Sequence, residues 1–390
     1  MTERRRILFL DHAGVLGGGE LSLLSIARAF RDEAEVILFE DGPFRRKLAE
    51  DGVAVSVLPM SGKLRTISRD GGLLNDAAAI PALLGHCLKV ARLARSSSVI
   101  YANSQKSMIV GAIAGALSRR PVIWHLRDLM DVAHFSSGHI RLAVGVANAF
   151  VSRIIANSEA TRDAFIASGG KAAKTLTVYN GIESDPFDSV DPSTSSLLRT
   201  ELGVTESDLL VGCFSRLSDW KGQHVLLEAI RKHPGWHALL VGDAIFDADT
   251  PYKSMLETLA SRYGMADRVH FLGFRDNVPE LMAACDIVAH TSTAPEPFGR
   301  VIVEGMLSRK PVIATNAGGA VELIRDRQTG LLVPPNDAIA LQGAISSLEQ
   351  DAQLRATIAS QGHDEAVSRF SSDRLVREVR AIVDSTRGGT

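Results

Sequence analysis

Two glutamates separated by eight positions are the side chains whose types and spacing best suggest chemistry. Glu296 lies in a segment that Pro295, Pro297 and Gly299 interrupt, and Glu304 follows eight residues later, a separation of about two helical turns, in the helix expected next. Because both carboxylates can border one crevice, they can accept hydrogen bonds from ligand hydroxyl groups, which suits a sugar ring for one and a ribose for the other. The alternative is a loop glutamate in solvent and a helix glutamate on a wet face.

The sequence around these glutamates predicts a strand, a tight loop, a helix and a second strand. The apolar run ending at His290 is typical of a buried parallel strand, a helix is expected from Arg300 to Lys310, and the next strand covers residues 312–315. Such a loop presents free backbone N–H groups and the positive end of a helix to an anion. The segment therefore predicts a phosphate site at the strand ends.

Two cations follow another apolar run. Residues 209–214 are predicted to form a strand, and Arg216 and Lys221 come directly after it. At a strand end, two such cations could clamp a diphosphate. The alternative is a pair of solvated surface cations.

The composition is that of an ordinary globular chain, and it excludes some classes of function. At 390 residues the length suggests two domains, and a net charge of -2 lacks the basic excess that binding to nucleic acid needs. Cys87, Cys213 and Cys285 stand alone in apolar surroundings, which indicates buried thiols in a reducing compartment. The N-terminus lacks the longer apolar region and the cleavage site of a signal peptide, so we expect a cytoplasmic protein.

The first half of the chain alternates short apolar runs with helix-like segments, which favours a mostly parallel α/β sheet. A strand at residues 7–10, a glycine-rich loop at 12–19 and a helix at 20–30 are expected first. The glycines would let the backbone approach a ligand closely. Gly17, Gly19 and Ser22 partly match a dinucleotide-binding motif with Glu40 as its acidic residue, but the third glycine is missing.

Three polar positions lie where further strands are expected to end. These strands are predicted at residues 53–58, 99–102, 122–125 and 154–156, and the positions are Asn103, His125 and Asn157. His125 could hydrogen-bond a substrate hydroxyl, with Arg127 or Asp128 as an orienting residue or counter-charge. A structural histidine with satisfied hydrogen bonds is the alternative.

A change in composition indicates a domain boundary. Residues 183–196 are rich in Pro, Ser and Asp, which is typical of a linker. We expect an N-terminal domain at 1–188, a C-terminal domain at 189–370, and a helix and tail at 371–390 that pack back on the N-terminal domain. Strands of the C-terminal domain are expected at residues 209–214, 237–241, 269–272, 287–289, 312–314 and 331–333, and the chain from Asp337 is helix-like.

A series of motifs runs through nearly the whole chain. It comprises Gly17-Gly18-Gly19-Glu20, His125, Asn157-Ser158, Asn180-Gly181-Ile182, Arg216 with Lys221-Gly222, Phe271-Leu272-Gly273, the segment from Glu296 to Glu304, and Pro311 to Thr315. This series resembles the retaining family-4 glycosyltransferases of GT-B fold. Small departures bear on the subfamily: GGGE replaces GGxE with Ala or Thr, Ser215 stands where Gly often precedes Arg216, and Gly305 replaces the usual Ala.

The resemblance implies two Rossmann-like α/β domains facing a cleft, and it implies roles for individual residues. Arg216 and Lys221 would hold the donor diphosphate, Glu304 the ribose and Glu296 the donor sugar, which His125 would contact from across the cleft. The implied catalytic set is His125, Glu296, Arg216 and Lys221, and the implied donor-binding set is Gly18, Gly19, Asn157, Arg216, Lys221, Glu296, Phe298, Gly299, Arg300 and Glu304.

The resemblance also implies an activity. A retaining glycosyltransferase would move a sugar from a UDP- or GDP-type nucleotide sugar to a hydroxyl of a glycan, a lipid-linked saccharide or a small molecule, in the synthesis of cell-surface polysaccharide or glycoconjugate. A nucleotide-sugar epimerase of the same architecture, an NAD-dependent oxidoreductase and a non-catalytic sugar-nucleotide binding module remain alternatives.

No metal or cofactor is expected, although Asp247 and Asp249 form an Asp-x-Asp pair like that of metal-dependent glycosyltransferases. They follow Gly242 by several residues in a polar loop before a helix, where aspartates commonly serve as turn and cap residues. We therefore expect them to lie apart from the diphosphate cations. With Arg216 and Lys221 supplying positive charge, the leaving group would not require a divalent ion.

Basic residues in the first half suggest contact with a membrane surface. Lys63, Arg65 and Arg69 form one cluster, and Arg45, Arg46 and Lys47 form another. These side chains could bind anionic lipid at the inner face of a membrane while the enzyme uses a lipid-linked acceptor.

Overall fold

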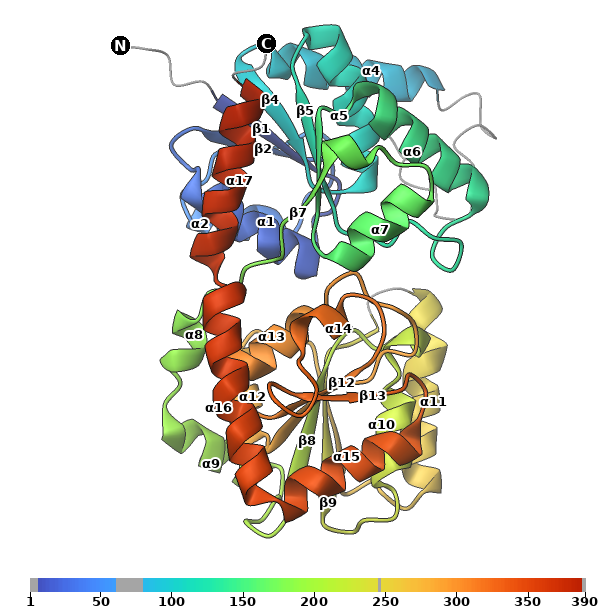
Figure 1. The fold of residues 1–390 in the computed structure, drawn as a ribbon, viewed down its shortest axis with the longest axis vertical. Helices are drawn as coiled ribbons and strands as arrows, with labels where there is room; N and C mark the ends of the chain where they lie inside the picture. Colours follow the sequence, from blue (N-terminus) through green and yellow to red (C-terminus); the bar gives the residue numbers. More distant parts are fainter. Residues whose placement is uncertain (1–5, 61–79, 245–246, 388–390) are drawn as a thin grey trace. The chain divides into compact units, whose positions relative to one another are not determined.

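The computed structural model describes residues 6–60, 80–244 and 247–387. The chain divides into two compact units, Met1–Gly181 with Ser372–Thr390 and Ile182–Ser371. Each unit is a parallel β-sheet covered by helices, as expected for α/β domains of alternating strands and helices (Figure 1). In the described part of the chain, no helix combines the length and the apolar character that crossing a lipid bilayer would require.

The described residues of the first unit form a seven-stranded sheet with the order β3-β2-β1-β4-β5-β6-β7. Its strands are β1 (Arg6–Asp11), β2 (Ala34–Leu38), β3 (Val55–Val57), β4 (Ser97–Ala102), β5 (Val122–Leu126), β6 (Arg153–Ala156) and β7 (Thr175–Thr177). All neighbouring strands pair in parallel, so their carboxyl ends meet at one edge. The order reverses between β1 and β4, where open α/β sheets usually bind ligands.

Helices cover both faces of this first sheet. One face packs against α4 (Ile80–Ala94), α5 (Gln105–Ser118), α6 (Ser137–Phe150) and Phe165 of α7 (Glu159–Ala167). The other packs against α1 (Gly18–Ala29), α2 (Pro43–Glu50) and α17 (Ser372–Arg387). The last of these is the C-terminal helix, which lies beside α1 within the first unit (Figure 1).

The second unit has a six-stranded parallel sheet with the order β10-β9-β8-β11-β12-β13 in its described residues. Its strands are β8 (Leu209–Phe214), β9 (Trp236–Val241), β10 (Val269–Gly273), β11 (Ile287–His290), β12 (Val312–Thr315) and β13 (Leu331–Val333). One face packs against α10 (Gln223–Ile230), α11 (Thr250–Arg262) and α15 (Ala338–Gln350). The remaining helices are α8 (Asp185–Asp188), α9 (Pro192–Glu201), α12 (Val278–Ala284), α13 (Arg300–Leu307), α14 (Ala320–Leu323) and α16 (Ala352–Arg369).

Most predicted strands are confirmed within one or two residues, and the expected helical C-terminal region is confirmed. Two local predictions differ from the structure. β7, with the short sequence Thr-Leu-Thr, was not predicted because three residues do not establish a hydrophobic pattern. The predicted linker at 183–196 is wrong, because most of it folds into α8 and the start of α9. Its Asp191 caps α9 by accepting a hydrogen bond from the Ser193 N–H, so the Pro and Asp residues mark a helix start.

Candidate functional site

The second unit brings its predicted site residues together where the strand order reverses. Arg216 and Lys221 follow β8, and Glu296 follows β11, the neighbouring strand on the other side of the reversal. Because these strands are parallel, the loops after them leave the same edge of the sheet. The topology therefore explains why residues far apart in the sequence share one site.

The two loops are interlocked by hydrogen bonds. The Thr293 N–H donates to the Trp220 carbonyl at 2.8 Å, and the Thr291 hydroxyl donates to the Lys221 carbonyl at 2.9 Å. Gly222 has a φ of 69°, and a Cβ there would lie 2.1 Å from the Thr291 carbonyl oxygen. A side chain at position 222 would therefore push the loops apart.

Glu296 is the centre of a buried polar network. Its Oε1 accepts from the Lys221 ammonium group and the Ser292 hydroxyl, and the His290 Nε2 lies 3.1 Å away. The Glu296 and Lys221 side chains are only 8% and 17% exposed. Burial alone would raise the pKa of the Glu296 carboxyl, but Lys221 and His290 more than offset it and hold the pKa well below its usual range.

This arrangement leaves Glu296 ionised, and its second oxygen accepts no hydrogen bond from the part of the chain that the structure describes. The three polar contacts converge on Oε1, and Oε2 has no partner among the described residues. A carboxylate can only accept hydrogen bonds, so Oε2 suits a ligand hydroxyl group. The predicted sugar contact of Glu296 is compatible with this geometry and stays a prediction.

Glycines fix the backbone behind Glu296. The Gly319 N–H donates to the Glu296 carbonyl at 2.7 Å, and a Cβ at Gly318 would lie 2.4 Å from that same oxygen. Gly318 also has a φ of 60°, which a side chain would strain. The Phe298 side chain is buried with its ring 5.9 Å from that of Phe370, so only its backbone is suited to ligand binding.

The helix α13 carries Arg300 and Glu304, which the sequence assigned to the donor site. Arg300 Nη2 lies 3.1 Å from Glu304 Oε1, one helical turn along the same face. Gly299 precedes the helix with a φ of 96° and offers no side chain to cap its first N–H groups. The N-terminus of α13 thus keeps the character of an anion site, and the ribose role of Glu304 stays a prediction.

The structure corrects the expectation for Asp249. This residue precedes α11 without a capping hydrogen bond from its side chain, and its Oδ2 lies 3.5 Å from Arg216 Nε. Asp249 therefore does not lie apart from the two cations predicted to bind a diphosphate but partly neutralises one of them, Arg216. The error arose because the distance spanned by the loop after β9 could not be judged from its sequence. Among the described residues, no group of three or more His, Cys, Asp or Glu side chains could hold a metal ion.

The first unit places His125 at the end of β5. Its ring is fully buried, and Nδ1 lies 2.6 Å from the Tyr101 hydroxyl oxygen and 3.1 Å from Arg127 Nη2. Of the two residues proposed to orient His125, Arg127 makes this contact, whereas Asp128 accepts from Gln105 at 3.4 Å. The expected link between His125 and Arg127 is therefore present.

Gly18 and Gly19 follow β1, and Asn157 follows β6, so all three lie beyond the carboxyl ends of strands of the first sheet. Gly18 begins α1, and a Cβ at Gly19 would lie 3.1 Å from Arg127 Cδ, so Gly19 makes room for the arginine. Asn157 Oδ1 accepts from the Thr161 hydroxyl at 2.8 Å, which uses one side of its amide within α7. Donor binding by these three residues stays a prediction.

Sequence reasoning missed four residues that complete these networks: Tyr101, Asn180, His290 and Ser292. His290 and Ser292 flank the end of β11, so their proximity to a predicted strand end was the available indication. Asn180 was noticed only as part of a motif, yet its Oδ1 accepts from Arg127 at 2.9 Å and from the Ser22 hydroxyl at 3.2 Å. Nothing in the sequence indicated a role for Tyr101, because a tyrosine in an apolar run is typical of an ordinary buried strand.

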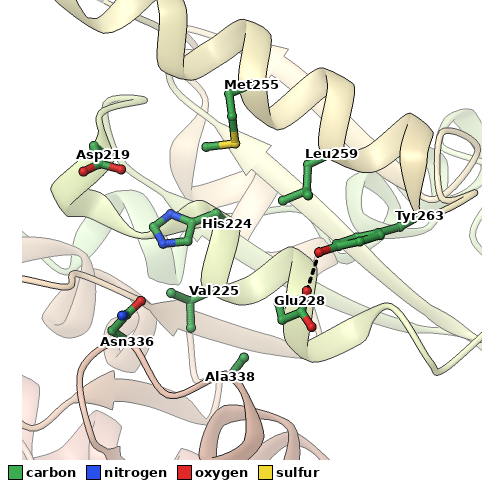
Figure 2. A pocket seen from close by; sticks show the side chains of 9 residues that line it. All are labelled: Asp219, His224, Val225, Glu228, Met255, Leu259, Tyr263, Asn336 and Ala338. Atoms are coloured by element: carbon green, nitrogen blue, oxygen red, sulfur yellow. Dashed lines mark hydrogen bonds between the residues drawn. The ribbon is translucent and has the colours of Figure 1, made fainter.

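A cavity of about 360 Å³ lies elsewhere in the second unit, between α10, α11 and the start of α15. Figure 2 shows its lining side chains, with the Tyr263 hydroxyl donating to Glu228 Oε2 at 2.6 Å. The lining comprises Asp219, His224, Val225, Glu228, Met255, Leu259, Tyr263, Asn336 and Ala338. None of the predicted donor-binding residues is among them.

Two family models match the sequence. Glycosyl transferases group 1 matches residues 196–365, and the Glycosyl transferase 4-like domain matches residues 17–181. The crystal structure of Anabaena Alr3699/HepE in complex with UDP-glucose is 43% identical in sequence, with a TM-score of 0.89. The similarity covers 97% of this chain and 99% of HepE.

Curated relatives from Rhizobium meliloti (strain 1021) act in lipopolysaccharide core biosynthesis. The glycosyltransferase LpsE is 32% identical over 177 residues, which are 45% of this chain and 50% of LpsE. The mannosyltransferase LpsB is 27% identical over 277 residues, which are 67% of this chain and 75% of LpsB. The chain thus spans between half and three quarters of the length of these curated relatives. Neither the epimerase nor the oxidoreductase alternative is supported. From the two parallel sheets, the family matches and the similarity to HepE, the chain belongs to the group 1 glycosyltransferases of GT-B fold.

Proposed function

We propose that the protein transfers a sugar from a UDP-linked donor to a hydroxyl acceptor, with retention of the anomeric configuration. The observation that carries the proposal is the Lys221–Glu296 pair at the strand-order reversal, where a cation and an ionised hydrogen-bond acceptor stand side by side. A nucleotide sugar presents the matching groups, a diphosphate and sugar hydroxyls. The choice of UDP is supported by HepE, whose structures are complexes with UDP-glucose, with UDP and glucose, and with UDP.

In this proposal the protein acts mainly by stabilising the charges that develop during transfer. As the bond between sugar and phosphate breaks, positive charge grows on the sugar ring and negative charge on the leaving diphosphate. Arg216, Lys221 and the N-terminus of α13 stabilise the leaving group, so the proposal requires neither a metal ion nor a cofactor. The acceptor attacks from the face that the diphosphate leaves, and the departing phosphate oxygen takes the proton of the acceptor hydroxyl.

The donor is tested with labelled UDP-glucose, UDP-galactose and GDP-mannose, incubated with and without an extract that supplies acceptors. We expect UDP release and a labelled glycosylated product that depend on the extract. An altered free nucleotide sugar without acceptor would instead indicate an epimerase. Calorimetry with UDP and GDP separately tests the choice of nucleotide, because binding of GDP alone would contradict the UDP assignment.

The proposed acceptor is a glycan or lipid-linked saccharide that becomes part of a cell-surface polysaccharide or glycoconjugate. LpsE and LpsB, whose names place them in lipopolysaccharide core biosynthesis, support this class. Fractionating the labelled product into lipid, polysaccharide and small-molecule pools tests it. Label confined to the small-molecule pool would contradict the proposal.

We also propose that the protein contacts the inner face of a membrane through α4. Ile80, Leu84 and Leu88 repeat every fourth residue along this helix and are 42%, 49% and 48% exposed. Arg92 lies one turn beyond Leu88, Arg95 directly follows the helix, and neither pairs with a carboxylate among the described residues. We call these five residues the α4 face. Apolar side chains beside cations match an anionic lipid surface, to which each cation adds about 1 kcal/mol.

The α4 face replaces the basic clusters considered from sequence. Arg45 pairs with Asp41 at 2.6 Å, and the Lys47 ammonium lies 3.6 Å from Glu50, so part of that cluster is already neutralised. Lys63, Arg65 and Arg69 lie outside the described residues. The α4 face is therefore the better-supported surface for membrane contact.

Sedimentation with phosphatidylglycerol-containing and pure phosphatidylcholine vesicles tests the α4 face. The wild type should bind the anionic vesicles at low salt, and the double variant Leu84→Ser, Leu88→Ser should bind them less. Leu197→Ser is a matched control, because Leu197 is 63% exposed on α9 in the second unit. Equal sedimentation of the double variant and the control would exclude this surface.

A further inference from the structure

The hydrogen-bond partners of His125 determine which of its ring nitrogens carries the proton. Arg127 Nη2 lies 3.1 Å from Nδ1, and an arginine guanidinium can only donate hydrogen bonds. Nδ1 must therefore offer a lone pair. The Tyr101 hydroxyl, 2.6 Å from the same nitrogen, then also donates to it. In a neutral ring with an unprotonated Nδ1, the proton is on Nε2.

The surroundings of His125 also keep the ring neutral. Burial and the positive charge of Arg127 lower the pKa of His125 well below its usual value. An imidazolium would carry a proton on Nδ1 and a positive charge. The hydrogen bond from Arg127 would then be lost, and the two positively charged groups would repel each other. The neutral Nε2–H form is therefore the only protonation state that satisfies both neighbours.

The Nε2–H group itself has no hydrogen-bond partner among the described residues, although it is buried. Most buried polar groups in proteins are hydrogen-bonded, and leaving one unpaired typically costs about 1 to 3 kcal/mol. A bound ligand that accepts a hydrogen bond from this group would explain why the protein leaves it unpaired. Since Nε2–H is a donor, the ligand atom must be a hydrogen-bond acceptor.

Arg127 is held in place independently of His125. Its Nε donates to Asn103 Oδ1 at 2.7 Å, and its Nη1 donates to Asn180 Oδ1 at 2.9 Å. Asn103 Nδ2 in turn donates to Asp11 Oδ2 at 2.5 Å. These bonds join the ends of β1, β4 and β5 to the segment after β7, so the guanidinium cannot readily turn away from Nδ1.

Three other titratable groups lie around Arg127, on β1, on α1 and in the loop between them. Asp11 is fully buried and keeps a lowered pKa although burial opposes ionisation, because His12 and Asn103 donate hydrogen bonds to it. Burial and the Asp11 charge raise the pKa of Glu20 to about 7. Glu20 thus changes charge near neutral pH, while Arg127 stays charged and keeps Nδ1 as an acceptor.

We propose that Arg127 is a positioning residue that holds His125 as the neutral Nε2–H tautomer, with the Tyr101 hydroxyl as a second donor to Nδ1, so that His125 donates a hydrogen bond to an oxygen of the transferred sugar. The sugar in this statement rests on the proposed function, whereas the tautomer does not. His125 then acts only as a donor. It cannot take the proton of the acceptor hydroxyl, because its single lone pair is already used.

The tautomer is tested in the free protein by long-range ¹H–¹⁵N correlation spectra of histidine-labelled protein, with the His125 signals assigned by their loss in His125→Gln. We expect Nε2 to be protonated and Nδ1 to be unprotonated, with no titration between about pH 5.5 and about pH 8.5. Titration of His125 near its ordinary pKa, or a proton on Nδ1, would overturn the proposal.

Variants separate the contributions of the two neighbours. Tyr101→Phe should keep the Nε2–H form, because Arg127 still requires an acceptor at Nδ1. Arg127→Met should admit the other tautomer and a titration of the ring. Tyr252→Phe is the matched control, since the Tyr252 hydroxyl contacts His224 Nδ1 at 2.9 Å in the second unit. It should leave the His125 signals unchanged, and an unchanged spectrum in Arg127→Met would contradict the positioning role.

The turnover rates of two His125 variants test whether His125 donates a hydrogen bond to the sugar. The amide nitrogen of a glutamine can occupy the place of a histidine Nε2, so His125→Gln should retain more activity than His125→Ala, by about tenfold. Equal activity of the two variants would contradict the donor role. Absence of transfer by the wild type would contradict the proposed function, and the tautomer would still be decided by the spectra.

Discussion

The Lys221–Glu296 pair makes a prediction about stability that depends on which partner is removed. Lys221→Met retains most of the apolar stem but leaves the Glu296 carboxylate buried, where Ser292 and His290 are its remaining Oε1 contacts among the described residues. Removing one partner of a buried ion pair typically costs 3 to 5 kcal/mol, and we expect about 3 because these neighbours still offset part of the charge. Glu296→Gln should cost less, about 1 to 2 kcal/mol, because Lys221 is 17% exposed and lies 4.2 Å from the centre of the Trp220 ring.

The pH dependence of this loss follows from the pKa of Glu296. The folded pKa lies well below the unfolded value, so in the wild type the pair stabilises the fold above the unfolded pKa and loses this contribution as the pH falls through the folded pKa. Without Lys221, burial dominates and the folded pKa rises. Lowering the pH then protonates the buried carboxyl, which removes its unpaired charge and restores part of the variant's stability. The difference between wild type and Lys221→Met should therefore be largest near pH 7 to 8 and should shrink towards about pH 5.

Urea unfolding followed by fluorescence measures these differences. Replacing Trp124 with Phe in every variant leaves Trp220 and Trp236, both in the second unit, as reporters. The double variant Lys221→Met, Glu296→Gln should recover most of the loss and give a coupling energy of about 2 to 4 kcal/mol. Losses that simply add, or a Lys221→Met loss that grows as the pH falls, would refute the reasoning.

Four further outcomes are expected. Arg216→Ala should lower kcat about a hundredfold with unchanged far-UV circular dichroism, and near-normal turnover would contradict the diphosphate role. Glu304→Ala should weaken calorimetric binding of free UDP by about 1.5 to 3 kcal/mol, whereas Glu296→Ala should mainly reduce turnover, and equal weakening by both would contradict the division of roles. Asp249→Asn should tighten UDP binding a few-fold because it removes one negative charge from beside Arg216, with Asp247→Asn as the unaffected control, and weaker binding would show that Asp249 orients the arginine instead. Transfer should survive excess EDTA, and loss of activity that Mg²⁺ or Mn²⁺ restores would contradict metal independence.

The sheets were largely predictable because each strand is a short apolar run between turn residues. Residues 209–214 illustrate this, since all six are buried and bounded by polar positions. The segment at 183–196 was not predictable, because Pro and Asp occur both in linkers and at helix starts.

The candidate site was predictable as a set of strand-end residues but not as a network. Arg216, Lys221 and Glu296 could be placed on one edge because parallel strands share their carboxyl ends. The contact of Asp249 with Arg216 depends on the path of a loop, and the contact of Tyr101 with His125 depends on the register of β4 and β5. Composition and periodicity do not encode either distance.

The return of α17 to the first unit affects how the chain folds as it is synthesised. Leu375, Val379, Ile382 and Val383 belong to the same hydrophobic core as α1 and β1, yet the ribosome makes them only after the whole second unit. At about 5 to 20 residues per second, the first sheet waits roughly 10 to 40 seconds with one face incompletely covered. Burying four such side chains contributes at most about 6 to 12 kcal/mol, which is comparable to the entire stability of a domain. The nascent first unit therefore presents an apolar surface that a chaperone can recognise, until the final helix covers it.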